Sequence, residues 1–357
     1  MEKNNQSKSS SFLFSTLNDS KKRFGIENNE NVYSKDSQPA RDVFQKRMAR
    51  RYHCPDIITH HAKILTDILL SVLASGNEKI AVHQYCFAPL RKILDSVTQV
   101  HGIRILEFTD EISLQKIADS GIKAIFLSSS CVECENMNMT KTSEIAHNYH
   151  VPLIVDNTLA TSCIVNPLEL GADIVMVFSG MISVENNKNN YLSLIDGNTF
   201  DWSYKSQYIR IFPFLKYAVP LISCMKFKCR KSAPVLNKEN QAEFFMLCEG
   251  LQTLNNRMTV HSENAKTVTE VLQPYAKKIT LQQFPNGNVM FLKVQLKAEW
   301  VEKFRFSLKS ISVSNTKQFY HTYSCTSVCQ QGDILYIKCG TEPESYIRHL
   351  FIGEFPV

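Results

Sequence analysis

Residues 151–181 read VPLIVDNTLATSCIVNPLELGADIVMVFSGM, and this stretch decides the fold. Two short apolar runs, PLIVD at 152–156 and DIVMVFS at 173–179, flank a stretch that contains turn-forming residues. Continuous rather than alternating apolar runs of this length are typical of strands that are covered on both faces of a parallel sheet. The first run ends in Asp156, so we expect a carboxylate at the end of a buried strand.

Similar apolar runs occur on both sides of this stretch and alternate with helical patterns. The strand-like runs are KIAVH (79–83), GIRILEF (102–108), KAIFLS (123–128) and YLSLI (191–195), and the helical ones are RDVFQKRMARRY (41–52) and AKILTDILLSVLASG (62–76). Gly76 is a natural C-cap for the second helix. Short apolar strands separated by helices predict a three-layer α/β domain with a mostly parallel sheet over residues 32–225.

The two ends of the chain differ from this central part. Residues 226–357 contain a long helical pattern at 239–272 and then the strand-like runs VMFLKVQL (289–296) and ILYIKCG (334–340). This order predicts a smaller α+β C-terminal domain. Residues 1–31 are rich in Ser, Asn, Lys and Glu and too polar to form a core, so we expect an N-terminal arm that is disordered or laid on another subunit.

Charge and cysteine content argue against several classes of protein. The 40 Lys and Arg against 34 Asp and Glu give a net charge of +6, spread along the chain without a basic block. This distribution argues against binding to nucleic acid or to a membrane surface. No apolar run is long enough to span a bilayer, no signal-peptide pattern is present, and the eleven cysteines lack regular spacing. We therefore expect a cytoplasmic protein with free thiols.

Several separated blocks, in the same order, resemble one enzyme family. The blocks are YSKDSQPARDVFQKRMA (33–49), VPLIVDNTLATSCIVNPLELGADIV (151–175), GNTFDWSYKSQY (197–208) and EGLQTLNNRMTVHSENAKTVTEVL (249–272). Together they resemble the pyridoxal-phosphate (PLP) enzymes of cysteine and methionine metabolism, the transsulfuration family. The last two blocks look most like its sulfhydrylase branch, close to O-acetylhomoserine sulfhydrylase and cystathionine gamma-synthase. The resemblance implies a PLP fold-type I (aspartate aminotransferase-like) architecture.

The resemblance also implies roles for four residues. Asp156 stands where the family keeps the carboxylate that protonates the pyridine nitrogen, and Tyr85 stands where an aromatic ring stacks on the cofactor. Tyr33 and Lys35 stand where a Tyr and an Arg reach across the dimer to the partner's phosphate. Taken alone, each residue also has a structural interpretation, because an Asp after a strand is often a cap and a Tyr beside a strand is often core.

The position implied for the Schiff-base lysine carries no amine. Aligned without gaps, the family's His-Ser-x-Thr-Lys falls on residues 177–181, which places Met181 at the lysine and Phe178 and Gly180 at phosphate-binding hydroxyls. A shift by one residue places Ile182 there instead. Neither side chain forms an imine, so we expect no covalently bound PLP, and any PLP that is retained is expected to bind non-covalently.

Other expected binding positions are altered as well. The family's Ser-Gly-Met phosphate loop reads THHAK at 59–63, with His60 and His61 where the backbone should approach an anion closely. The chain has only 12 glycines, when average usage of about 7% predicts roughly 25. On the substrate side, Val132 replaces an asparagine, and Tyr336 replaces the arginine that binds the substrate carboxylate. The sequence predicts a closed, catalytically degenerate site.

Two cysteine pairs and three histidines are weaker candidates for metal binding. Four thiolates, from Cys131, Cys134, Cys325 and Cys329, are enough to hold zinc. Their irregular spacing, without flanking turn glycines, instead favours free cysteines near the surface. His60, His61 and His83 are interpreted as residues at strand ends and a helix start, so no metal site is predicted.

Three functional hypotheses from different classes remain open. The first is a non-catalytic pseudoenzyme that forms a homo-oligomer, or a hetero-oligomer with an active homologue, because the family builds each active site from two subunits. The second is an active PLP-dependent C–S lyase or sulfhydrylase that uses another lysine, Lys188 being the nearest in sequence. The third is a binding module that uses the altered cleft for a different ligand.

Overall fold

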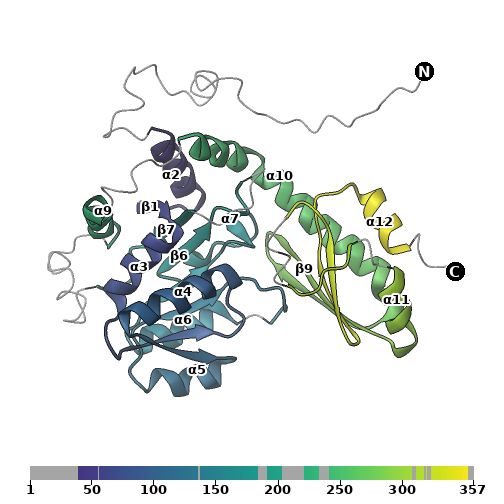
Figure 1. Cartoon of the computed structure of the whole chain (residues 1–357), viewed down its shortest axis with the longest axis horizontal. Helices are drawn as coiled ribbons and strands as arrows, with labels where there is room; N and C mark the ends of the chain where they lie inside the picture. Colours follow the sequence, from purple (N-terminus) through teal and green to yellow (C-terminus); the bar gives the residue numbers. More distant parts are fainter. Residues whose placement is uncertain are drawn as a thin grey trace.

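The computed structural model contains two β-sheets that are connected by a long helix (Figure 1). It describes residues 39–54, 56–135, 137–183, 191–202, 221–232, 241–307, 311–316, 319 and 323–352. Within these residues, no helix is long and apolar enough to cross a membrane.

The larger sheet has seven strands and is mostly parallel, as predicted. Its strands are β1 (Asp56–His61), β2 (Lys79–His83), β3 (Arg104–Phe108), β4 (Ile125–Ser128), β5 (Leu153–Asp156), β6 (Ile174–Phe178) and β7 (Tyr191–Asp196). They are arranged in the order β1-β7-β6-β5-β4-β2-β3, and β7 runs antiparallel to both of its neighbours. The residues of β4, β5 and β6 are all buried, which explains their continuous apolar sequences. β1 was not predicted as a strand.

Helices cover both faces of this sheet. They are α2 (Pro39–Arg51), α3 (Ala62–Leu73), α4 (Ala88–His101), α5 (Glu111–Ala118), α6 (Met139–Asn148), α7 (Thr161–Ile164), the 3-10 helix η1 (Pro167–Leu170) and α9 (Leu221–Ser232). α3 packs against α4 and α9, and α5 packs against α6. The prediction that Gly76 caps α3 is wrong, because the helix ends at Leu73 with Ala74 as the C-cap. Gly76 takes a left-handed φ of 57° in the turn that follows.

The C-terminal part forms a second, smaller α+β unit. After α10 (Gln241–Leu272) come η3 (Gln273–Tyr275), β8 (Ala276–Phe284), β9 (Gly287–Leu296), η4 (Ala298–Trp300), α11 (Val301–Ser307), β10 (Ser327–Gln331), β11 (Ile334–Lys338) and α12 (Glu344–Ile352). The four strands form an antiparallel sheet in the order β10-β11-β9-β8. α10 packs against β9 and α12. This unit has its own hydrophobic core, which includes Val268, Leu292 and Ile337.

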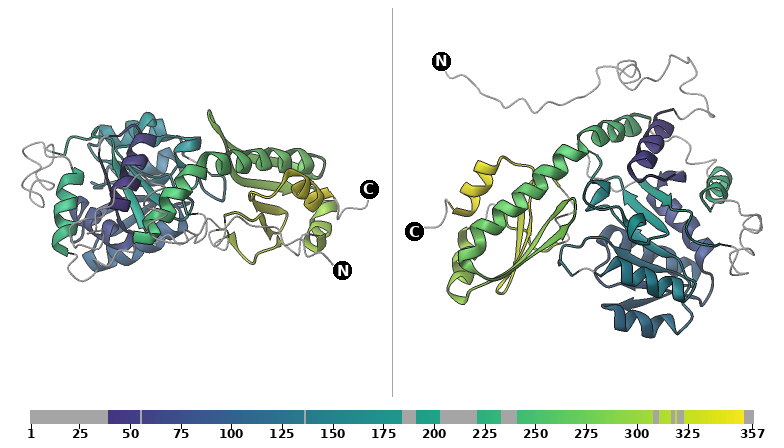
Figure 2. Two further views of the ribbon diagram at one scale, coloured as in Figure 1. Left: turned by 90° about the horizontal axis from the view of Figure 1, so that it is seen from above. Right: turned by 180° about the vertical axis from the view of Figure 1, so that it is seen from behind.

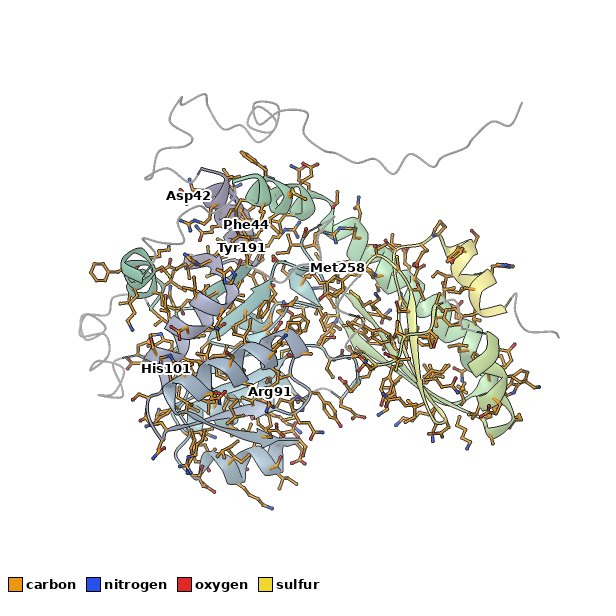
Figure 3. All side chains as sticks on the ribbon, in the orientation of Figure 1. Asp42, Phe44, Arg91, His101, Tyr191 and Met258 are labelled. Carbon is orange, nitrogen blue, oxygen red and sulfur yellow. The ribbon has the colours of Figure 1, made fainter. Side chains whose placement is uncertain are left out.

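The helix α10 contributes to both units, as the two views of Figure 2 show. Near its start, Phe244 packs against Phe44 of α2 and Tyr191 of β7, both labelled in Figure 3. Nearer its end it packs against the small sheet. The boundary predicted at residue 226 falls inside α9, which packs against α3, β1 and β7 of the large unit.

Candidate functional site

Asp156 ends β5 and carries a buried acceptor without a partner. Its side chain is 2% exposed, and Oδ1 accepts a hydrogen bond from the backbone N–H of Thr158 at 2.7 Å. Oδ2 has no hydrogen-bond partner among the described residues. Burial raises the pKa of Asp156 from 3.8 to about 7, and the bonds from Thr158 only partly offset this effect. A protonated ring nitrogen is the kind of donor that this oxygen lacks.

Tyr85 lies in the turn directly after β2, at the same edge of the sheet as Asp156. This edge is formed by the carboxyl ends of the parallel strands, where ligands bind in open α/β sheets. The Tyr85 ring is half-buried and lies edge-on to His83, with ring centroids 5.6 Å apart. His83, a predicted strand-end residue, is buried and also contacts Phe108. The sheet therefore brings two of the four predicted residues, Tyr85 and Asp156, to one edge.

Met181 is fully buried in the turn between β6 and β7. Arg257 of α10 holds this turn: Nη1 donates to the Met181 carbonyl at 2.9 Å, and Nη2 donates to the Ile182 carbonyl at 3.0 Å. Gly250 lies beneath the turn, where a Cβ would be only 1.9 Å from the Ile182 oxygen. The turn is therefore fixed to α10 by both hydrogen bonding and close packing.

An aromatic side chain, Phe178, stands at one of the positions implied for phosphate binding, and Phe87 packs against it. Phe178 is fully buried, and its ring centroid lies 5.5 Å from that of Phe87. The Phe178 backbone N–H donates to Thr158 Oγ1 at 2.9 Å, and the Phe87 N–H donates to Ser128 Oγ at 2.8 Å. These backbone donors are thus satisfied by side-chain hydroxyls. The two aromatic rings add apolar surface, which disfavours an anion.

A buried imidazole lies at the end of β1, just before α3 begins. His60 is buried, and its Nδ1 accepts a hydrogen bond from the backbone N–H of His61 at 2.8 Å. Burial lowers the pKa of His60 to about 4, with smaller effects of Arg41 and His61, so the ring is neutral at pH 7. His61 is exposed at the N-cap of α3. The interpretation of both residues as strand-end and helix-start residues is confirmed.

The substrate side of the expected cleft is bridged by contacts between the two units. Lys293 of β9 forms an ion pair with Glu135, which lies in the loop after β4, at 2.6 Å. Lys293 pairs with Tyr336 in the β9–β11 ladder. In the same loop, burial raises the pKa of Glu133. Sequence reasoning missed Lys293, and its only signal was a charged residue inside the apolar run VMFLKVQL.

The cysteine prediction needs a correction. Of the four residues considered for zinc, only Cys325 is exposed, whereas Cys131, Cys134 and Cys329 are buried. The Cys134 thiol packs against the Phe291 carbonyl of β9 at 3.6 Å, so the loop that was expected at the surface lies beneath the C-terminal sheet. No group of three metal-ligating side chains occurs in the part of the chain that the structure describes.

Amines are the remaining requirement of PLP chemistry. Lys188, Tyr33 and Lys35 lie outside the described residues. Within the described residues, Lys338 is the one buried lysine, and burial lowers its pKa to about 8. It belongs to β11 of the small sheet, where Nζ donates to the Phe319 carbonyl at 3.4 Å. The described residues therefore fit the ring-nitrogen end of PLP at Asp156, but not its aldehyde or its phosphate.

Comparison with known proteins identifies the relatives of this chain. The O-acetyl-L-homoserine sulfhydrylase of Corynebacterium glutamicum is 26% identical over 287 residues, which cover 75% of this chain and 65% of that protein. The homocysteine synthase of Schizosaccharomyces pombe is 26% identical over 290 residues, which cover 75% of this chain and 66% of that protein. The chain thus spans slightly less than two thirds of the length of these relatives.

Solved structures confirm the fold. The O-acetylhomoserine sulfhydrylase of Wolinella succinogenes superposes with a TM-score of 0.72 at 17% identity, covering 89% of this chain and 97% of that one. A Campylobacter jejuni protein whose structure carries N'-pyridoxyl-lysine-5'-monophosphate gives a TM-score of 0.71 at 19% identity, covering 96% and 92%. Residues 4–329 match the family model described as Cys/Met metabolism PLP-dependent enzyme. The chain therefore belongs to the Cys/Met metabolism PLP-dependent enzyme family.

Proposed function

We propose that this chain is a catalytically inactive member of the family, which acts by assembling with an active homologue. The observation that carries the proposal is the turn at Met181. The side chain at the position implied for the Schiff-base lysine is a buried thioether, in a turn that Arg257 holds against α10. A thioether forms no imine, so the side chain at this position cannot bind the PLP aldehyde covalently.

The surroundings of Asp156 support the same proposal. Phe178 and Phe87 present apolar surface, and the neutral His60 ring lies at the end of β1, just before α3. The Lys293–Glu135 ion pair bridges the cleft, which favours assembly over a binding module that admits a new ligand there. An active enzyme that uses Lys188 is the competing hypothesis, and the first experiment below separates the two.

We expect the purified protein to contain no lysine-bound PLP. The purified protein is reduced with borohydride and mapped by peptide mass spectrometry, with an active family sulfhydrylase as the positive control. Met181→Lys alone is expected not to create O-acyl-homoserine turnover, because Phe178, His60 and Tyr336 are unchanged. A phosphopyridoxyl group on Lys188 or on any other lysine of the cleft in the unaltered protein, or turnover by the single variant, contradicts the proposed inactivity.

We also expect the chain to donate groups to the PLP site of its partner. In the family the segment that corresponds to Tyr33 and Lys35 serves the neighbouring subunit, and Lys35 would form a charge-assisted hydrogen bond to phosphate. Such bonds typically contribute about 1.5 kcal/mol or more, so Lys35→Ala is expected to lower PLP affinity in the mixed oligomer by about tenfold.

The measurement is PLP retention in a mixed oligomer, co-expressed with an intact homologue from the same genome and purified through a tag on each chain. Lys22→Ala serves as the matched control, because it removes a lysine from the same N-terminal segment. If the mixed oligomer forms and both variants retain PLP equally, donation is wrong and only scaffolding remains. If the chain forms only homo-oligomers, the assembly proposal fails.

A further inference from the structure

An open cavity lies where the two units meet, and Asp156 does not line it. Its volume is about 460 Å³, and it is lined by the end of α2, by α7, by the middle of α10 and by the β8–β9 turn. Met258 of α10, labelled in Figure 3, lies in its wall between the two units. A volume of this size is within the range that holds a small molecule.

The cavity wall contains a partly exposed thiol. Cys163 of α7 donates a hydrogen bond to Asn255 Oδ1 at 3.1 Å, and its sulfur accepts one from Arg51 Nη1 at 3.7 Å. The same Arg51 Nη1 donates to Asn255 Oδ1 at 2.8 Å, while Nη2 donates to the Leu251 carbonyl at 2.7 Å. The guanidinium is therefore held firmly beside the sulfur.

The charges around the cavity favour an anion. Arg51 and the exposed Lys266 line it, and Glu263 is the acidic residue of the lining. Burial lowers the pKa of Arg257, which holds the Met181 turn, and the nearby Cys163 thiol partly opposes this effect. Cationic groups around a concave surface raise the local concentration of anionic ligands.

Nine of the ten other cysteines are poor competitors for a reagent in solution, because they are buried. All eleven are described, and all except Cys163 and Cys325 are buried. Burial raises the pKa of buried thiols such as Cys86 and Cys339, which keeps them protonated and unreactive. Cys325 is exposed, but it does not line the cavity. It therefore serves as an internal reference thiol.

We propose that this cavity is a modification site, at which Cys163 forms a mixed disulfide with a small anionic disulfide. The Cys163 thiolate attacks one sulfur of the bound disulfide, so that a new S–S bond forms and the original S–S bond breaks. Cys163 is oxidised, and the departing half is reduced and leaves as a thiol after taking up a proton. Arg51 and Lys266 hold the carboxylates of the reagent during this exchange. The reaction needs no PLP and is independent of the proposed assembly.

The experiment compares two disulfides of opposite charge on the full-length protein: glutathione disulfide, which is anionic, and cystamine, which is dicationic. Samples are quenched with acid at several times, and the modification of Cys163 and Cys325 is quantified separately by peptide mass spectrometry. The preference of a thiol is the ratio of its modification rate with glutathione disulfide to its rate with cystamine. Because the cavity charges concentrate anions, this ratio is expected to be about tenfold greater at Cys163 than at Cys325. Lys266→Gln should reduce the preference at Cys163 and leave that at Cys325 unchanged.

The proposal is overturned if Cys163 stays unmodified in the folded protein, or if both thiols show the same preference between the two reagents. A preference at Cys163 that is unaffected by Lys266→Gln also overturns it, because the cavity charges would then have no role. Lys266 is exposed, so its substitution is not expected to disturb folding.

Discussion

Asp156→Asn is expected to stabilise the protein by about 4 kcal/mol at pH 8 and to leave its stability nearly unchanged at pH 3. The folded-state pKa of Asp156 is about 7, against 3.8 in its ordinary environment. One pKa unit corresponds to about 1.4 kcal/mol, so this shift corresponds to about 4 kcal/mol. An amide has a shape similar to a protonated carboxyl and cannot ionise.

The sign follows from the direction of the shift. Below about pH 4 the Asp156 carboxyl is protonated in both the folded and unfolded states, so its ionisation does not oppose folding. Between about pH 4 and pH 7 the unfolded state ionises first, and the free energy of unfolding falls as the pH rises. Above about pH 7 the carboxyl is ionised in both states, and the free energy of unfolding falls no further on its account.

The measurement is urea denaturation of the parent and of Asp156→Asn from pH 3 to pH 8. The difference between their free energies of unfolding isolates the contribution of this one carboxyl. Asp95→Asn, at an exposed position on α4, is the comparison, because losing an exposed ion pair with Arg91 changes stability little and should not give a gain of this size at pH 8. A flat difference for Asp156→Asn would mean that the carboxyl finds a partner in solution that lowers its pKa. A difference that shrinks as the pH rises would also contradict the expectation.

Gly250→Ala is expected to lower the free energy of unfolding by about 2–3 kcal/mol. In most helices this change is stabilising by about 1 kcal/mol, because alanine has the higher helix propensity. Here the new Cβ would lie 1.9 Å from the Ile182 oxygen and 2.9 Å from its carbonyl carbon. These are backbone atoms in the turn that Arg257 holds, so α10 and the turn have to separate, at the upper end of the usual cost of overpacking.

The control is Asn256→Ala, because Asn256 is an exposed position on the same helix and the substitution changes helix propensity without a clash. Both variants are compared with the parent by urea denaturation, which reports the midpoint urea concentration and the slope of the unfolding free energy against urea. Gly250→Ala should lower the midpoint concentration, and Asn256→Ala should leave it unchanged or raise it. If Gly250→Ala is stabilising, the turn at Met181 is not packed against α10 in solution.

The sequence predicted the strands of the large sheet well where burial was complete. β4, β5 and β6 are covered on both faces, so each is an uninterrupted apolar run. β1 was missed because it is an edge strand that ends in Thr59, His60 and His61, and edge strands carry polar residues. The end of α3 was misplaced because Gly76 serves the following turn instead of the helix.

The candidate site was predictable only in part. The roles of Asp156 and Tyr85 were implied by the family resemblance, and the structure places each at or just after the end of a recognisable strand. Arg257 and Lys293 were not found, because their roles depend on contacts with residues far away in the sequence. Arg257 binds a turn 75 residues earlier, and Lys293 pairs with a residue 158 positions earlier. No local periodicity carries such information.

The shared helix α10 affects how the protein unfolds. At 32 residues and about 1.5 Å per residue, it is a rod of about 48 Å that supplies buried side chains to both hydrophobic cores. Fraying of one end removes support from one core and shortens the helix that the other core needs. The two cores are therefore coupled through one element, and a lesion in either core is expected to lower the melting temperature of the whole chain in a single cooperative transition.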